Sequence, residues 1–418
     1  MIEFKRRILD NGLTVIAHKD ESTPMAAVNV LYDVGSRDDR PGKTGAAHLL
    51  EHLMFGGSLN IASYDREVQK AGGENNAFTS NDITNYYISL PSVNIETGMW
   101  LESDRMIGLN FSEKGLDVQK KVVAEEFRQR YLNQPYGDTW MLLRPLAYKV
   151  HPYRWPVIGS DVAHISNITL DEIREYYSEH YCPSNAILSV SSALEEDYCL
   201  DLAEKWFGTV KKRKTKIRST PAEPQQDKMR KLDVTRDVPY DQIMIAYHMC
   251  ERDSRRYYAT DLISDLLAGG KSARLYRSLV MEKKIFGSIN AFITGDRDPG
   301  LFVVKGTVSE GIEAERAYDE ITGEINDFIS RPPKNEELEK VKNKVEATRQ
   351  YIQTSILYKA TDLAYYELIS DAGFLNEEIA QYRKTTQEEI TSIAASLFRQ
   401  ENSSVLFYRS NHKSKPRK

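Results

Sequence analysis

The sequence predicts an α+β protein with two similar halves, each a mixed, mostly antiparallel sheet with helices packed on one face. Three observations support this fold class. The chain has 418 residues, too many for one ordinary hydrophobic core. Residues 211–233 contain almost no large apolar side chains, as expected of an interdomain linker. The order of strands and helices restarts after this stretch, as in a degenerate duplication. We therefore expect domains at 1–210 and 234–418.

The elements of the first half follow from residue patterning. Residues 8–20 and 25–36 are strand-like, with apolar and polar residues roughly alternating around an Asn-Gly turn. A loop rich in Gly, Pro and charge then precedes a helix that carries His48. Further helices are expected near 93–107, 113–133 and 169–181, two strands within 71–91, and a strand at 185–192.

The second half repeats the early part of this order. A strand at 241–250 is followed by a helix at 257–270. Two strand candidates, 288–295 and 300–308, lead to a helix near 311–330. The shared order of strand, helix, glycine turn and strands predicts that both halves have one fold.

Composition argues against several functional classes. The net charge of −5 is mild for this length, and the basic residues of the linker have no interleaved aromatics, so we expect no nucleic-acid partner. No apolar stretch is long enough to span a bilayer, and the N-terminus lacks the apolar region of a signal peptide. The three cysteines, Cys182, Cys199 and Cys250, are too scattered for a disulfide framework. A cytoplasmic protein is expected, or a periplasmic one if a leader has been removed.

The segment GAAHLLEHLMFGGS, residues 45–58, carries the main chemical signal. His48, Glu51 and His52 stand at i, i+3 and i+4 and share one helix face. Two imidazoles one turn apart can both bind Zn²⁺, and a glutamate beside them can take the proton of an attacking water. This HxxEH spacing is the inverzincin motif. The alternative, two satisfied helix histidines with a salt-bridged glutamate, is disfavoured by the apolar residues that flank the trio.

A catalytic zinc site needs a third protein ligand. The predicted helix GLDVQKKVVAEEFRQRY offers two acidic candidates. Glu126 lies beside an apolar stripe that includes Val122 and Phe127, whereas Glu125 lies one helical step away. Because an acidic pair on a helix is usually a solvated face, the spacing does not decide which of the two glutamates is the third ligand.

Several blocks together resemble one protein family. LDNGLTV, GAAHLLEHLMFGGS, AGGENNAFTSNDITNYYISLP, VVAEEF and HPYRWPVIGS occur in the order of the pitrilysin/insulinase–mitochondrial processing peptidase family and cover most of residues 9–190. The stretch 269–276 resembles the second domain of that family. The resemblance implies that His48 and His52 are zinc ligands and that Glu51 is the general base. It also selects Glu126 over Glu125 as the third ligand.

The resemblance further implies a substrate-binding strand. In the family, the segment matching Asn76, Ala77, Phe78 and Thr79 is an edge strand beside the zinc, and the peptide substrate pairs with it. Backbone pairing of this kind reads an extended chain with little regard for its sequence, which suits broad specificity.

Two positions depart from the family pattern. Gln119 replaces an acid that the family usually has seven residues before the ligand glutamate. The arginine and tyrosine that face the zinc from the second domain fall on Val280 and Gly287, which offer no side-chain donor, although Lys283 or Lys284 could substitute. Since some members divide these roles between two chains, the resemblance implies a partner subunit in a heterodimer that closes around a chamber, with a homodimer also possible.

The function expected from the sequence is therefore a zinc-dependent endopeptidase acting on peptides or small unfolded polypeptides. The alternative is a non-catalytic core subunit of a larger complex, a role that this fold also fills. Such subunits often lose the zinc residues, whereas His48, Glu51, His52 and Glu126 are all present here.

Overall fold

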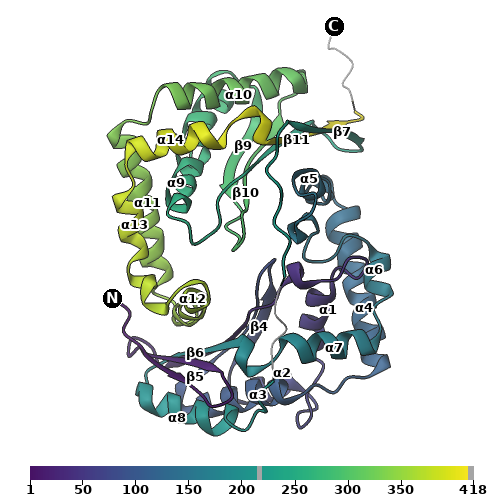
Figure 1. Cartoon of the computed structure of the whole chain (residues 1–418), viewed down its shortest axis with the longest axis vertical. Coiled ribbons are helices and arrows are strands. Elements are labelled where there is room, and N and C mark those ends of the chain that lie inside the picture. The colour runs from purple at the N-terminus through teal and green to yellow at the C-terminus, as the bar shows by residue number, and fades with distance from the viewer. Residues whose placement is uncertain (214–218, 413–418) are drawn as a thin grey trace. The chain divides into compact units, whose positions relative to one another are not determined.

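The computed structural model describes residues 1–213 and 219–412, so residues 214–218 of the predicted linker lie outside the described residues. The chain forms two compact units (Figure 1). Unit 1 consists of Met1–Gln129, Trp155–Thr220 and Arg349–Glu377; unit 2 consists of Arg130–Arg154, Pro221–Thr348 and Glu378–Lys418. Each unit therefore includes a segment from the other side of the linker, whereas the sequence suggested one division there.

Unit 1 is built on a six-stranded mixed sheet in the order β1-β2-β6-β3-β5-β4. Its strands are β1 (Lys5–Ile8), β2 (Thr14–Lys19), β3 (Met25–Tyr32), β4 (Glu74–Thr79), β5 (Thr84–Pro91) and β6 (Ala186–Ser192). Only β2 and β6 run parallel; the other neighbours are antiparallel. The central strand β3 is an almost continuous apolar run buried on both faces, while β4 lies at an edge.

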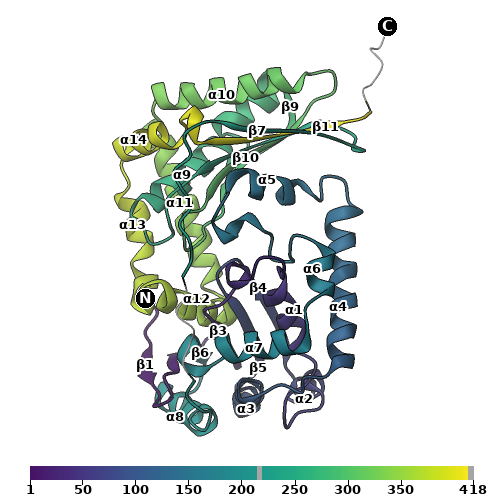
Figure 2. The same ribbon diagram turned by 45° about the vertical axis from the view of Figure 1, so that its right-hand side comes forward.

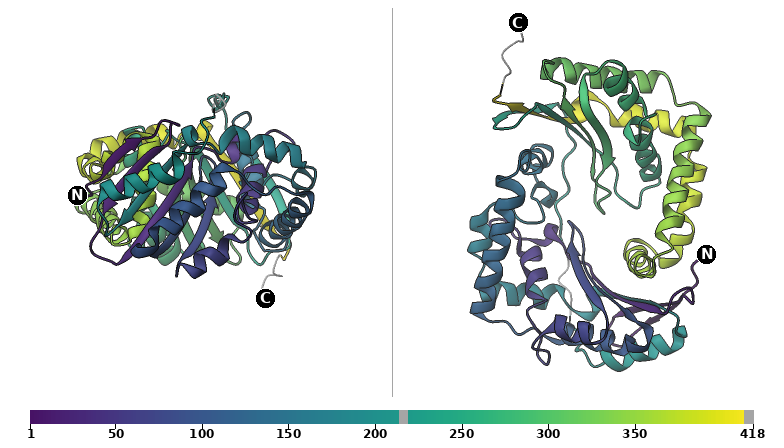
Figure 3. Two further views of the ribbon diagram at one scale, coloured as in Figure 1. Left: turned by 90° about the horizontal axis from the view of Figure 1, so that it is seen from below. Right: turned by 180° about the vertical axis from the view of Figure 1, so that it is seen from behind.

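Helices cover both faces of this sheet, whereas the sequence predicted helices on one face. They are α1 (Ala46–Leu53), α2 (Tyr64–Lys70), α3 (Ile95–Ile107), α4 (Glu113–Phe127), α6 (Val162–Ser166), α7 (Leu170–His180), α8 (Glu196–Phe207) and α12 (Ile356–Ile369). Helices α3 and α8 lie on one face, as the view from below in Figure 3 shows. On the opposite face, Leu363 and Ala364 of α12 join Ile16, Leu31 and Ile187 of the sheet in one apolar cluster.

Unit 2 repeats this plan with a five-stranded sheet in the order β7-β11-β8-β10-β9. The strands are β7 (Arg230–Arg236), β8 (Gln242–His248), β9 (Phe286–Ile293), β10 (Leu301–Val308) and β11 (Ser403–Ser410). Here β7 and β11 are the parallel pair, in the place of β2 and β6. The matching strand orders confirm the predicted α+β class with two similar halves.

Helices α5 (Thr139–Ala147), α9 (Arg256–Ala268), α10 (Ala314–Ser330), α13 (Glu378–Lys384) and α14 (Gln387–Leu397) belong to unit 2, and α11 (Asn335–Ile352) begins there. Tyr318 of α10 packs on Phe407 of β11, on one face of the sheet. Leu143 and Ala147 of α5 cluster with Met244 and Val303 on the other face. Each sheet thus receives one helix from the other half of the sequence.

Most predicted elements are confirmed within one to three residues, and two differences have simple causes. The helix expected over 113–133 is α-helical only to Phe127, after which Arg128–Leu132 form a π-helical turn. Strand β7 begins at Arg230, inside the stretch interpreted as linker, because an edge strand tolerates the exposed charges that made it resemble a linker. No helix among the described residues combines the length and apolar character needed to cross a membrane.

Candidate metal centre

Helix α1 is fixed at its N-terminus by a buried carboxylate. Asp39 accepts hydrogen bonds from the backbone N–H groups of Gly45 (2.7 Å) and Ala47 (2.9 Å), two of the donors that have no partner within the helix. Gly45 has a φ of 95°, and a Cβ there would lie 2.6 Å from the carbonyl oxygen of Ile158. Only glycine fits this entry to the helix.

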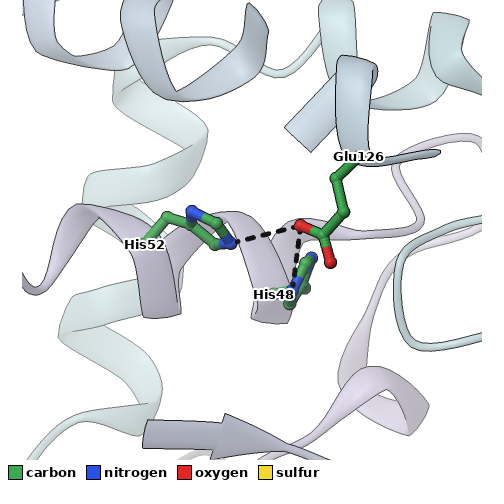
Figure 4. Close-up of side chains that lie close together, drawn as sticks. All are labelled: His48, His52 and Glu126. Carbon is green, nitrogen blue, oxygen red and sulfur yellow. Dashed lines mark ion pairs between the residues drawn. The ribbon is translucent and has the colours of Figure 1, made fainter. Parts of the chain in front are cut away.

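His48 and His52 of α1 meet Glu126 of α4 (Figure 4). The Oε2 atom of Glu126 lies 3.9 Å from Nε2 of His48 and 3.6 Å from Nε2 of His52. The three candidate ligand atoms all lie within 4.8 Å of one another. Helices α1 and α4 lie side by side, and β4 lies next to α1 (Figure 2). The structure therefore brings together the three residues predicted as zinc ligands.

The adjacent Glu125 does not take part in this cluster. Its side chain is 54% exposed and lies 3.3 Å from Arg128 and 3.2 Å from Gln129. The two candidates left open by the helical spacing thus have different environments, and Glu126 is the one beside the histidines.

The donor set fits zinc. Two imidazole nitrogens and one carboxylate oxygen are typical ligands of a catalytic zinc site, and tetrahedral ligands at about 2.1 Å from an ion stand about 3.4 Å apart. The separations of 3.6 and 3.9 Å need only a small adjustment to reach that spacing. The side chains of His48, His52 and Glu126 keep 13%, 25% and 18% exposure, so the cluster is open on one side, as a catalytic site requires.

Glu51 shares the α1 face with the two histidines but stands outside the ligand cluster. The hydroxyl of Thr79 on β4 donates a hydrogen bond to its Oε2. Burial raises the pKa of the Glu51 carboxyl, and the charge of Glu126 acts in the same direction, while the Thr79 hydrogen bond and His52 oppose the shift. A carboxylate with a raised pKa is a stronger base than an exposed one and is better suited to accept a proton.

Strand β4 contains the four residues predicted to bind substrate, Asn76, Ala77, Phe78 and Thr79. It pairs with β5 on one side only, so its other edge is free within the sheet. The backbone N–H of Ala77 donates to the side-chain oxygen of Asn76 (2.8 Å) rather than to β5. Phe78 is 40% exposed, whereas Ala77 and Thr79 turn toward α1 and are half-buried.

The departures from the family pattern lie on defined elements. Gln119 is a half-buried residue of α4. Val280 lies in a π-helical turn, Tyr276–Glu282, and Gly287 is exposed on β9. The Lys283 ammonium is bound by Glu320 (2.8 Å) and Glu324 (2.9 Å) of α10.

Sequence reasoning missed two contacts at the centre. Asp39 lies six residues before Gly45, outside the usual N-cap position, so no local signal marks it as the support of α1. The Thr79–Glu51 hydrogen bond joins residues that are 28 positions apart, and it depends on the placement of β4 against α1.

Two family models match this chain. Residues 14–147 match the family model described as insulinase (peptidase family M16), and residues 167–345 match the one described as peptidase M16 inactive domain. The zinc protease PqqE of Helicobacter pylori is 31% identical over 409 residues, which span 96% of this chain and 91% of that protein.

Solved structures share the fold. A crystal structure of a protease from Helicobacter pylori superposes with a TM-score of 0.92 at 30% identity and covers 98% of this chain and 100% of that one. Pitrilysin superposes with a TM-score of 0.76 at 14% identity, and the match spans all of this chain but 45% of pitrilysin. The latter likeness concerns the fold alone.

Proposed function

Because this chain belongs to the insulinase family, peptidase family M16, and is a zinc metalloprotease of that family, we propose that it is an endopeptidase of peptides and small unfolded polypeptides. We further propose that it is the zinc-bearing subunit of a heterodimer. The endopeptidase proposal rests on the cluster of His48, His52 and Glu126. Glu51 lies on the same face of α1, and the free edge of β4 lies next to that helix.

In the proposed mechanism, His48, His52 and Glu126 would hold the metal. A zinc ion bound there would supply Lewis acidity. Glu51 accepts the proton of that water as the carbonyl carbon is attacked, and then delivers it to the leaving amine nitrogen. The raised pKa of Glu51 supports this double role, because the carboxyl group must be a base in one step and an acid in the next.

The substrate is proposed to lie along β4 as an additional strand. The Ala77 N–H would then exchange the Asn76 side chain for a carbonyl oxygen of the peptide. Backbone pairing at a free edge requires an extended, unfolded segment, which supports peptides and small unfolded chains as the substrate class.

The proposal of a second subunit rests on Val280 and Gly287. Neither side chain can donate a hydrogen bond to a developing oxyanion, and loss of one such donor typically costs about 10²–10³ in rate. Lys283 is bound to two glutamates of α10 and is poorly placed to substitute. A related chain that supplies an arginine and a tyrosine, and encloses a chamber with this one, would complete the site.

Cleavage of a quenched-fluorescent peptide library tests the proposal. The zinc-loaded chain is assayed alone and after mixing with a related chain encoded beside it, and we expect turnover only in the mixture. Activity of the chain alone would refute the divided site and support a self-sufficient chain or homodimer. Absence of turnover in both assays, with zinc bound, would favour a non-catalytic core subunit.

The Glu51→Gln variant is the matched control for this assay. The amide keeps the size of the side chain but cannot take a proton, so we expect turnover to fall by about 10²–10⁴. Zinc affinity, measured by competition with a chelator, should stay near that of the parent chain because Glu51 is outside the ligand cluster. Undiminished turnover in this variant would refute Glu51 as the base.

We propose the cytoplasm as the compartment. Cys182, Cys199 and Cys250 are all free thiols in the structure, which fits a reducing environment. Cell fractionation with an antibody to the chain tests this assignment; recovery in the periplasm would overturn it.

A further inference from the structure

Thr79 links the edge strand to the proposed base. It is the last residue of β4, directly opposite Thr84, the first residue of β5. Its hydroxyl donates to Oε2 of Glu51 and lies 3.4 Å from the hydroxyl oxygen of Thr84. The side chain therefore connects α1 to the end of the hairpin on which the peptide is proposed to lie.

The direction of these hydrogen bonds follows from counting hydrogens. A hydroxyl has one hydrogen to donate, and an ionised carboxylate only accepts. Thr84 donates its hydrogen to the carbonyl oxygen of Val34 (2.9 Å). This bond leaves Thr84 no hydrogen for Thr79. The Thr79 hydrogen is thus committed to Glu51.

We propose that Thr79 is a positioning residue for Glu51, held in place by its pairing with Thr84 at the end of the β4–β5 ladder. With Oε2 fixed by Thr79, Oε1 is the atom left to face the attacking water. After Glu51 takes a proton on Oε1, Oε2 remains the carbonyl oxygen of the acid and still accepts the Thr79 hydrogen, so one contact serves both steps. The inference rests on the proposed function, because it assigns the orientation of the base in that reaction.

The contact differs from ordinary strand packing. Thr79 and valine have nearly the same shape, and both suit a strand. Replacing Thr79 by valine therefore keeps the β4–β5 ladder while removing the hydroxyl. Serine restores the hydroxyl without the methyl group. Thr23 provides a matched control outside β4, since its hydroxyl oxygen accepts a hydrogen bond from the backbone N–H of Met25 (3.3 Å).

The test compares Thr79→Val, Thr79→Ser and Thr23→Val in the zinc-loaded chain under the conditions in which the parent cleaves peptides. For Thr79→Val we expect kcat to fall by about 10- to 100-fold, the usual range for losing a residue that orients an active-site group, with KM nearly unchanged. Thr79→Ser should recover most of kcat, and Thr23→Val should keep it. Zinc affinity, from chelator competition, should be the same in all variants.

Peptide binding separates positioning from substrate contact. Fluorescence anisotropy with a labelled peptide compares Glu51→Gln with the double variant that also carries Thr79→Val, and equal affinity is expected. Weaker binding by the double variant would overturn the inference and make Thr79 a substrate contact. Parental kcat in Thr79→Val, or equal losses in the valine and serine variants, would also overturn it while leaving the proposed function intact. Absence of peptide cleavage by the parent chain, both alone and mixed with the related chain, would overturn the inference and the proposed function together.

Discussion

Glu125 and Glu126 are neighbours on α4 with opposite surroundings, and this permits a sharp test of the metal site. We expect Glu126→Gln to lower zinc affinity by more than about 100-fold, because a charged ligand is lost and such a loss should exceed the 10- to 100-fold typical of residues behind the ligands. Glu125→Gln removes the same charge one residue away and should keep parental affinity. Chelator competition measures both.

Two controls complete this comparison. Thermal unfolding in the absence of zinc should be similar for both variants, since Glu126 and Glu125 both lie outside the apolar core. Equal zinc affinities in the two variants would contradict the assignment of Glu126 as a ligand.

Individual residues of the site differ in how well the sequence alone predicts their roles. The spacing of His48, Glu51 and His52 predicted the metal-binding face of α1, because a helix places such positions together whatever surrounds them. The choice between Glu126 and Glu125 needed family resemblance, since both glutamates lie on one helix. The support of α1 by Asp39 and of Glu51 by Thr79 could not be predicted, because both depend on loops and strands that meet only in the folded unit.

At the scale of elements, α12 is anchored to unit 1 by a buried ion pair. Lys359 of α12 lies 2.6 Å from Asp20, and their side chains keep 15% and 7% exposure. Burial raises the pKa of the Asp20 carboxyl, but hydrogen bonds from Lys359 and Ser22 outweigh it and hold the pKa at about 2, below the usual 3.8. A carboxyl group with a lowered pKa stabilises the fold above its unfolded-state pKa and loses this contribution as pH falls toward 2.

We therefore expect Asp20→Asn to reduce the free energy of unfolding by about 2 kcal/mol at pH 7 and by about half as much at pH 3. Urea unfolding at the two pH values measures the difference. Asp197→Asn, which breaks the exposed pair with Lys5, is the control and should be nearly neutral. If Asp20→Asn lowers the free energy of unfolding by the same amount at pH 7 and at pH 3, the result would contradict the role of the ion pair.

The free edge of β4 gives a second prediction at this scale. Proline is tolerated on an edge strand where its N–H does not join the ladder, and the Ala77 N–H bonds to the Asn76 side chain. In the inactive Glu51→Gln background, Ala77→Pro should keep the fold and weaken binding of a labelled peptide by about tenfold or more. Ala77→Ser, which retains the N–H, should bind as the parent does. Unchanged binding by the proline variant would refute β4 as the peptide-binding edge.

At the scale of the whole molecule, the two units do not coincide with the two halves of the sequence. A fragment of residues 1–220 lacks Arg349–Glu377 and leaves Ile16, Leu31 and Ile187 without their partners on α12. We expect this fragment to aggregate, since an exposed apolar sheet face promotes association. The complete unit 1, with residues 1–129, 155–220 and 349–377 joined by flexible linkers, should be monomeric by gel filtration and should bind zinc. A monomeric, folded 1–220 fragment would contradict this dependence.

The exchange of helices is the part of the fold that the sequence could not reveal. The sequence of α12 does not show which sheet the helix covers, because its apolar face would suit either one. The duplicated order of elements predicted two similar sheets, and this prediction is confirmed. The assignment of α5 to unit 2 and α12 to unit 1 depends on tertiary packing alone.

The place of α12 in unit 1 has a consequence for synthesis on the ribosome. The metal-binding residues His48, His52 and Glu126 leave the exit tunnel early. Helix α12, which covers one face of the unit 1 sheet, follows only after most of unit 2 has been translated. At ordinary elongation rates this interval is on the order of ten seconds. During that time the nascent chain presents an uncovered apolar surface, which makes it a client for chaperones. The yield of metal-competent protein should therefore depend on chaperone supply while translation is under way.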